Sequence, residues 1–121
     1  MQYLLLMYVD ERALSERERL ACYAASAQLA HAIKASGQSL AANPLHPTTM
    51  ATTVRMRDGK RFVTDGPFAE TREQLGGYFL IDAKHLDAAI TIAARMPMAR
   101  KGTVEIRPVL DIPGLPTDER A

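Results

Sequence analysis

Two short segments of the chain are apolar at every position. They are residues 3–9 (YLLLMYV) and residues 78–81 (YFLI). A strand with one face in solvent alternates apolar and polar residues, so each unbroken apolar run predicts a strand that is covered on both faces. The sheet that contains these strands must therefore be covered on both sides.

The rest of the pattern supplies helices for only one side of that sheet. A long helix over residues 16–36 is predicted by a capping box, in which Ser15 is the N-cap and Glu18 follows three residues later. A second helix is predicted after Asp82, its expected cap, and ends at Pro97. Two helices cover one face of a four- or five-stranded sheet. We therefore expect a second copy of the chain to cover the other apolar face, in a homodimer.

The remaining strands complete a recognisable order. Asp58-Gly59 lies between two β-rich runs and predicts a hairpin, and short strands are expected over residues 39–42 and 104–107. With the hairpin treated as an insertion, the order is β-α-β-β-α-β. This order predicts a ferredoxin-like α+β fold with an antiparallel sheet. We expect a single domain over residues 1–110 and a C-terminal tail over residues 111–121.

The segment between the hairpin and the second apolar strand contains several turn signals. Asp65-Gly66-Pro67 predicts a turn, in which the Asp65 carboxylate either accepts hydrogen bonds from backbone amides or points into a pocket as a general base. Thr71 and Gln74 predict a single helical turn, and Gly76-Gly77 is expected to end it before the strand begins.

Composition excludes several classes of function. The 121 residues contain 15 Lys and Arg and 14 Asp and Glu, so a net charge of +1 gives no general attraction to nucleic acid or to an anionic membrane. The one cysteine, Cys22, excludes an intramolecular disulfide, and the three histidines lack metal-ligand spacing. We expect no metal and no cofactor. No apolar run approaches the ~20 residues of a membrane helix, and the expected compartment is the cytoplasm.

Residues 65–78 (DGPFAETREQLGGY) form a long motif that resembles the DGPF group of the YCII-related family. The flanking stretches TTVRMRDGK, FLID and VEIRPV agree with this resemblance, which covers residues 1–110. It implies a dimeric α+β barrel, in which two ferredoxin-like sheets pack face to face. This is the architecture expected from the apolar strands.

The resemblance implies a range of functions and not one reaction. Most members have no assigned activity, and lyase or isomerase chemistry on small molecules is attributed to some. Genes of the DGPF group often lie beside extracytoplasmic-function sigma factors. The main interpretation is a cofactor-independent small-molecule enzyme with a pocket at the sheet interface. The alternative is a non-catalytic ligand-binding or regulatory dimer. Other relatives pair a histidine of the first helix with an aspartate; here Ser26 occupies that helix position, so this pair is not reproduced.

Six polar residues are candidates for a site that takes a small polar or anionic ligand. Two of them could be catalytic groups, and four could bind the ligand or orient those groups. Their alternative roles are structural: internal salt bridges, turn hydrogen bonds or solvated surface. The catalytic candidates are Asp65 and His46, and the binding candidates are Arg107, Ser26, Glu70 and Arg72.

The reasons for these choices are positional. Ser26 interrupts the apolar stripe of the first helix, and His46 lies in a proline-bounded loop that can overhang the sheet. Arg107 has the strand parity opposite to the residues expected under the helices, which suits an anion anchor. Glu70 and Arg72 follow the DGPF motif and are expected to orient Asp65 or a bound anion.

Overall fold

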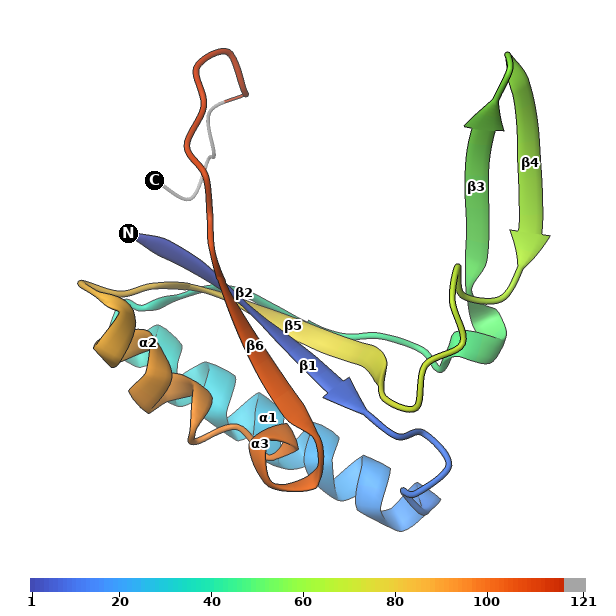
Figure 1. The fold of residues 1–121 in the computed structure, drawn as a ribbon. Helices are drawn as coiled ribbons and strands as arrows, with labels where there is room; N and C mark the ends of the chain where they lie inside the picture. Colours follow the sequence, from blue (N-terminus) through green and yellow to red (C-terminus); the bar gives the residue numbers. More distant parts are fainter. Residues whose placement is uncertain (117–121) are drawn as a thin grey trace.

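The computed structural model describes residues 1–116 and has the predicted ferredoxin-like α+β fold. Four antiparallel strands form one sheet in the order β2-β5-β1-β6 (Figure 1). Their bounds are β1 Gln2–Val9, β2 Ser39–Pro44, β5 Gln74–Asp82 and β6 Thr103–Pro108. The two apolar segments of the sequence therefore become the two central strands, β1 and β5.

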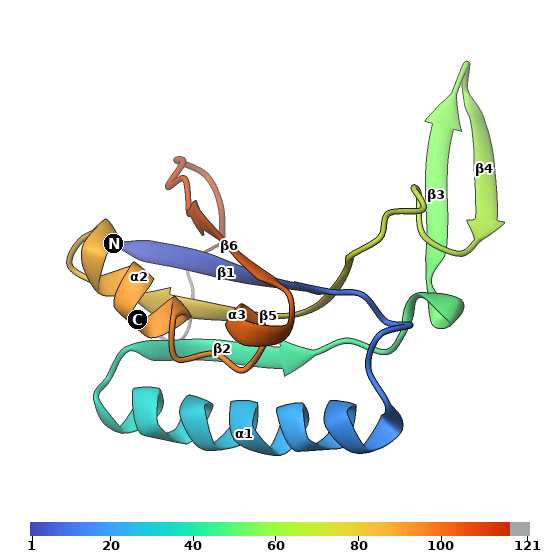
Figure 2. The ribbon, with the colours of Figure 1, turned by 60° about the horizontal axis from the view of Figure 1, so that its bottom comes forward.

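Three helices lie on one side of this sheet, and Figure 2 shows that α1 runs beneath β2. They are α1 Glu16–Ala35, α2 Leu86–Ala93 and the short α3 Met98–Lys101. The predicted capping box begins α1: Ser15 Oγ accepts a hydrogen bond from the Glu18 amide at 3.1 Å, and Glu18 Oε1 accepts one from the Ser15 amide at 3.2 Å. Local sequence thus determines where the first helix begins.

A two-stranded hairpin projects away from the main sheet. It consists of β3 Thr52–Arg57 and β4 Lys60–Asp65 and follows the 3-10 turn η1 Thr48–Met50. The turn residues Asp58 and Gly59 have φ angles of 50° and 74°. Two successive positive φ angles are the geometry of a type I′ turn, so the hairpin prediction is confirmed with its physical basis.

The two sides of the main sheet differ in exposure. Leu5 and Ile81 point toward the helices and are fully buried. On the other side Leu4, Leu6 and Leu80 are half-buried, because no helix covers them. We call this side the open face; the register places Tyr8, Tyr78, Glu105 and Arg107 on it as well. The expectation that β1 is covered on both faces is thus not met within one chain.

The segment that carries the DGPF motif differs from its prediction. Thr71 and Gln74 form no helical turn: Thr71 Oγ1 donates to the Glu73 carbonyl at 2.6 Å, and Gln74 Nε2 donates to the Thr71 carbonyl at 3.1 Å. Gly76-Gly77 does not end a helical turn before the strand begins; both glycines lie inside β5. A Cβ atom at Gly77 would lie 2.9 Å from Met7 Cε and 3.0 Å from the Asn43 carbonyl oxygen, so glycine permits the strands to pack there.

The predicted cap of the second helix is also wrong. Asp82 belongs to the end of β5, where its carboxylate accepts a hydrogen bond from the N-terminal ammonium of Met1 at 2.9 Å. The N-cap of α2 is His85, whose Nδ1 accepts a hydrogen bond from the Ala88 amide at 3.2 Å. Of the predicted tail, residues 111–116 extend beyond β6, and 117–121 lie outside the described residues.

Candidate functional site

A cavity of about 310 Å³ opens between α1 and the helix-facing side of the sheet. Its walls are side chains of α1, of β1, β2 and β5, and of the loop that follows β2. The volume lies at the lower end of the range for small-molecule sites, which is roughly 300–1,000 Å³. The cavity is therefore large enough for a small organic molecule.

Small residues create the space. Ser26, Ala27 and Ala30 of α1 face Ala42 of β2 and Gly76 of β5 across the cavity. Larger side chains at these positions would bring α1 and the sheet into contact, as they do elsewhere in the core. The cavity thus depends on a local sequence of small residues on both elements.

Most of the cavity wall is apolar, and polar groups are few. The helix contributes Arg19, Tyr23 and Ser26, which follow one another at the spacing of a helix face, and also His31. Within residues 1–116 the side chains of these four residues have no hydrogen bond or ion pair with another residue. Their polar atoms are therefore available to a bound molecule.

Two other polar residues of the cavity are fixed by neighbours. Glu11 accepts hydrogen bonds from the amide of Thr48, at 2.9 Å, and from its hydroxyl. Asn43 donates from Nδ2 to the phenolic oxygen of Tyr78 at 2.9 Å. The Glu11 contacts hold the loop after β2 against the segment between β1 and α1, and the Asn43 contact joins β2 to β5, so one rim of the cavity is ordered by side-chain hydrogen bonds.

Cys22 also lines the cavity, but its thiol is not activated as a nucleophile. The residue is buried, and burial raises the pKa of its thiol above the ordinary value of 9.0. The thiolate is the nucleophilic form of cysteine, and burial disfavours it. Cys22 is better suited to packing than to covalent catalysis.

Of the six residues expected from the sequence, Ser26 alone lines this cavity. His46 is exposed, although its neighbours Leu45 and Pro47 both contribute to the cavity wall. The loop therefore overhangs the cavity as predicted, but with apolar side chains. The catalytic role assigned to His46 remains a prediction without support from its position.

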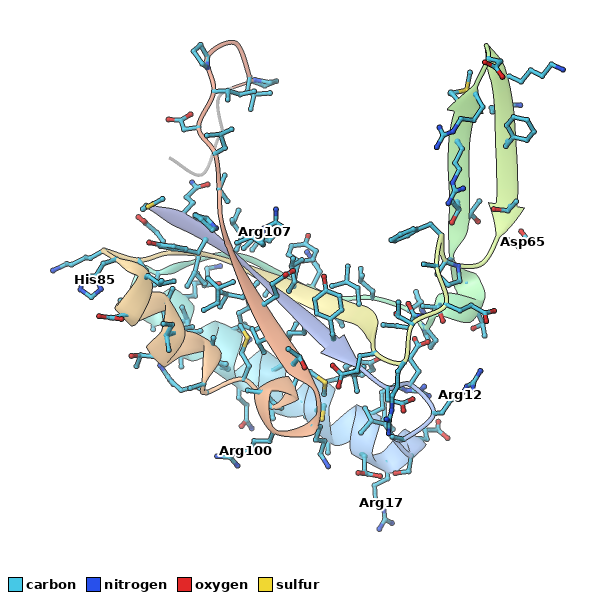
Figure 3. All side chains as sticks on the ribbon, in the orientation of Figure 1. Arg12, Arg17, Asp65, His85, Arg100 and Arg107 are labelled. Carbon is cyan, nitrogen blue, oxygen red and sulfur yellow. The ribbon has the colours of Figure 1, made fainter. Side chains whose placement is uncertain are left out.

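The other four residues lie elsewhere and apart. Figure 3 shows Asp65 on the projecting hairpin and Arg107 on β6. Glu70 and Arg72 are exposed in the loop before β5, and Arg72 Nε lies 3.7 Å from Asp10 Oδ2. The expected convergence of Asp65, Arg107, Ser26 and His46 in one pocket does not occur within a single chain, because Arg107 and Ser26 lie on opposite sides of the sheet.

The sequence reasoning missed other polar residues of the cavity. Arg19 was not selected, although its spacing of seven residues from Ser26 places it on the same helix face; His31 lines the cavity from a different direction, five residues after Ser26. Glu11 could not be found this way, because its position depends on the path of the chain between β1 and α1. Helical spacing around Ser26 was the available signal.

A second cluster of polar side chains lies on the open face, on the side of the sheet opposite the cavity. Tyr8 donates from its hydroxyl to Glu105 Oε1 at 3.4 Å. The pKa of Tyr8 is raised above its ordinary value of 10.0, first by burial and then by the nearby Glu105 carboxylate, while Arg107 opposes the shift. Glu105 and Arg107 thus point away from the helices, as the strand parity predicted.

None of the helices in residues 1–116 has both the length and the apolar character that a membrane span requires. Within the same range, no three His, Cys, Asp or Glu side chains gather as a group that could hold a metal ion.

Comparison with known proteins agrees with the fold. The family model of the YCII-related domain matches residues 1–113. An uncharacterized protein, R00369, of Rhizobium meliloti (strain 1021) is 48% identical over 67 residues, which are 54% of this chain and 54% of that protein. The chain thus aligns with about half the length of this curated relative. The match of nearly the whole chain to the family model shows that the protein belongs to the YCII-related domain family.

Proposed function

We propose that the protein binds a small molecule in the cavity beside α1, and that this molecule has an apolar body and one anionic group. The observation that carries the proposal is Arg19: the residue lines a mostly apolar cavity, and its guanidinium has no acidic partner within residues 1–116. A charged donor beside an apolar surface gains most from a ligand that supplies the missing anion. The apolar body would lie among side chains such as Phe79 and Met98.

Catalysis in the same cavity is the second candidate. It is favoured by the presence of one carboxylate, Glu11, and one imidazole, His31, among the lining residues. These two groups are common general acids and bases, and an isomerase or lyase needs one or both. Ser26 would orient the substrate by its hydroxyl. This reading needs no cofactor.

We also propose that the protein forms a homodimer through the open face. Leu4, Leu6 and Leu80 form an apolar strip along the two central strands of the open face, and each remains half-exposed in a single chain. A second copy placed sheet against sheet would remove this strip from water. Burying apolar surface is favourable by about 25 cal/mol per Å², and a self-complementary apolar face is the usual basis of a two-fold dimer.

The binding proposal is tested by filling the cavity. Ala25 and Ala27 are both exposed positions of α1, and of the two Ala27 alone lines the cavity. Ala27→Phe therefore adds bulk at the cavity wall, and Ala25→Phe adds the same bulk outside it. Freshly purified protein is examined by native mass spectrometry for a co-purifying molecule. In parallel, phenylacetate and its uncharged amide are titrated and followed by NMR chemical shifts.

We expect binding of phenylacetate to the wild type and to Ala25→Phe, and its loss in Ala27→Phe. The neutral amide should bind more weakly to every folded variant. Equal binding to both variants would place the ligand outside this cavity, and equal binding of acid and amide would refute the role of Arg19.

A further inference from the structure

The hairpin of β3 and β4, residues 52–65, has two faces with different chemistry; we call it the arm. Cross-strand pairing places Arg55 opposite Phe62 and Arg57 opposite Lys60 on one face. On the other face Val54 lies opposite Val63, and Met56 lies opposite Arg61. With the exception of Thr53, every residue of both strands is exposed.

The basic and aromatic face forms one wall of a shallow hollow. Pro67 and Phe68 of the following loop meet Arg55, Arg57 and Phe62 around a space of about 470 Å³. The loop is fastened to the base of the arm by two hydrogen bonds: the Gly66 amide donates to the Ala51 carbonyl at 2.7 Å, and Thr53 Oγ1 donates to the Gly66 carbonyl at 2.8 Å. The hollow is therefore a built feature of the arm, and not a gap beside a loose loop.

The hollow leaves large aromatic surface in water. Phe62 is 50% exposed and Phe68 is 76% exposed. A two-stranded hairpin that packs on nothing is at best marginally stable in water. We expect this arm to be held by contact with another surface.

A segment of the same chain has the complementary character. Residues 109–116 follow β6 and carry exposed Leu110 and Leu115, at 79% and 61%, and prolines at positions 113 and 116. Prolines restrict the backbone of this segment, which turns at Gly114 (φ 91°), and proline-containing segments with a restricted backbone dock against aromatic side chains. The charged residue of this segment is Asp111, and the sequence that follows contains Asp118, Glu119 and Arg120.

The arm cannot hold this segment within its own chain. The Val109 amide donates to the Gln2 carbonyl, so the segment leaves the sheet at the beginning of β1, whereas the arm joins β5 at the Val9 end. At ~3.3 Å per residue these ends of β1 are roughly 25 Å apart. Both features rise from the sheet on the side opposite the helices (Figures 1 and 2).

A second copy on the open face would bring the two features together. A two-fold axis across the direction of β1 places the arm of one protomer beside residues 109–116 of the other. A two-fold axis along β1 places arm against arm instead. The arm carries four basic and two acidic residues, so the second arrangement brings like charges together and the first brings Arg55 and Arg57 toward a segment that carries Asp111.

We infer that the arm of each protomer holds residues 109–116 of its partner, with the segment in the hollow between Phe62 and Phe68. The inference rests on the dimer proposed above. It assigns an interaction surface to the hairpin and a role to the chain that follows β6. Each dimer would contain two such contacts, one at each end of the paired sheets.

Cross-linking tests this arrangement directly. Cys22→Ala removes the native thiol, Thr64→Cys places a thiol on the hollow side of the arm, and Leu110→Cys places one on the segment. The two single-thiol variants are co-expressed with different affinity tags, and mixed dimers are isolated and treated with a short bismaleimide. We expect a covalent dimer that joins residue 64 of one chain to residue 110 of the other. Arg55→Glu should lower its yield several-fold, and Arg100→Glu on α3 should not.

The possible results distinguish a failure of the proposed arm contact from a failure of the proposed dimer. The Thr64→Cys protein is also cross-linked as a homodimer, and a link between its two copies of residue 64 would show arm against arm and refute the inference. A dimer by light scattering that gives no link between residues 64 and 110 would also refute it, and the dimer would stand. A monomer by light scattering would refute the dimer and the arm contact together.

Discussion

Gly102 lies directly against the backbone carbonyl of Tyr8, where α3 ends and β6 begins. A Cβ atom at Gly102 would overlap the Tyr8 carbonyl oxygen and lie 3.2 Å from Val9 Cα. The Gly102 amide also donates to the Met98 carbonyl at 2.7 Å, so the chain cannot easily shift away. This contact sets how closely β6 approaches the central strand β1.

Gly102→Ala should therefore destabilise the fold. The added methyl group meets backbone atoms, which cannot rotate aside, and overpacking of this kind costs roughly 1–3 kcal/mol of unfolding free energy. Urea unfolding followed by circular dichroism measures the effect. Arg100→Ala on the neighbouring exposed helix surface is the control, with an expected change within about 0.5 kcal/mol. Equal stability of Gly102→Ala and wild type would show that β6 can move away from β1.

Arg19→Ala should weaken the binding of an anionic ligand selectively. Loss of a hydrogen bond to a charged group costs about 1.5–3 kcal/mol, which corresponds to a roughly 10- to 150-fold weaker phenylacetate affinity. The affinity for the uncharged amide should change little. Arg17→Ala, an exposed position of α1 outside the cavity, controls for the loss of positive charge. If both variants lose affinity equally, the anion is attracted by the general charge of α1 and not held in the cavity.

Leu80→Asp should convert the protein to a monomer. Leu80 lies opposite Leu4 on the open face, so the substitution buries a carboxylate among apolar side chains in a sheet-to-sheet dimer. Light scattering during size-exclusion chromatography measures the mass at micromolar concentration. Leu20→Asp, at a 57% exposed position of α1, should remain dimeric. A dimeric Leu80→Asp protein would exclude the open face as the interface.

The turn of the DGPF motif should depend on Gly66 more than on Asp65. Within residues 1–116 the Asp65 carboxylate accepts no turn hydrogen bond, so the Asx-turn expected from the sequence is not formed. Gly66 has a φ angle of 98°, which disfavours any other residue. Gly66→Ala should cost about 1 kcal/mol by thermal unfolding, and Asp65→Ala should cost less than about 0.5 kcal/mol. The opposite ranking would restore a structural role for the Asp65 carboxylate.

The predictions from short sequence motifs were correct where the stabilising contacts join residues close together in the sequence. The capping box at Ser15 and Glu18 determines the start of α1, and Asp58-Gly59 determines the hairpin, because each acts through atoms a few residues away. Gly76-Gly77 was predicted to end a helical turn but lies inside β5, since the reason for Gly77 is its contact with Met7, a residue distant in sequence. Asp82 was misread as a cap for the same kind of reason, because it binds the N-terminus instead.

The candidate site required more than local signals. Ser26 was found because a hydroxyl interrupts an apolar stripe, and this reasoning extends to Arg19 by helical spacing alone. Grouping Ser26 with Arg107 failed because strand parity gives the side on which Arg107 lies but not the side on which the cavity forms. The size of the cavity depends on Ala42 and Gly76 packing opposite α1, which only the tertiary structure reveals.

The ion pair between Glu18 and Lys101 should make stability depend on acid pH. Lys101 Nζ lies 3.0 Å from Glu18 Oε2, and its hydrogen bond, followed by that of the Ser15 amide, lowers the pKa of Glu18 below its ordinary value of 4.5. A carboxyl group with a lowered pKa in the folded state stabilises the fold above its unfolded pKa, and this contribution is lost as the pH falls through the folded pKa. Glu18→Gln should therefore show a lower melting temperature than wild type at pH 7 and a shallower decrease below pH 4.5. Glu16→Gln, in the same first turn of α1, should keep the wild-type slope. Parallel curves for wild type and Glu18→Gln across the acid range would show that Glu18 titrates alike in the folded and unfolded chains.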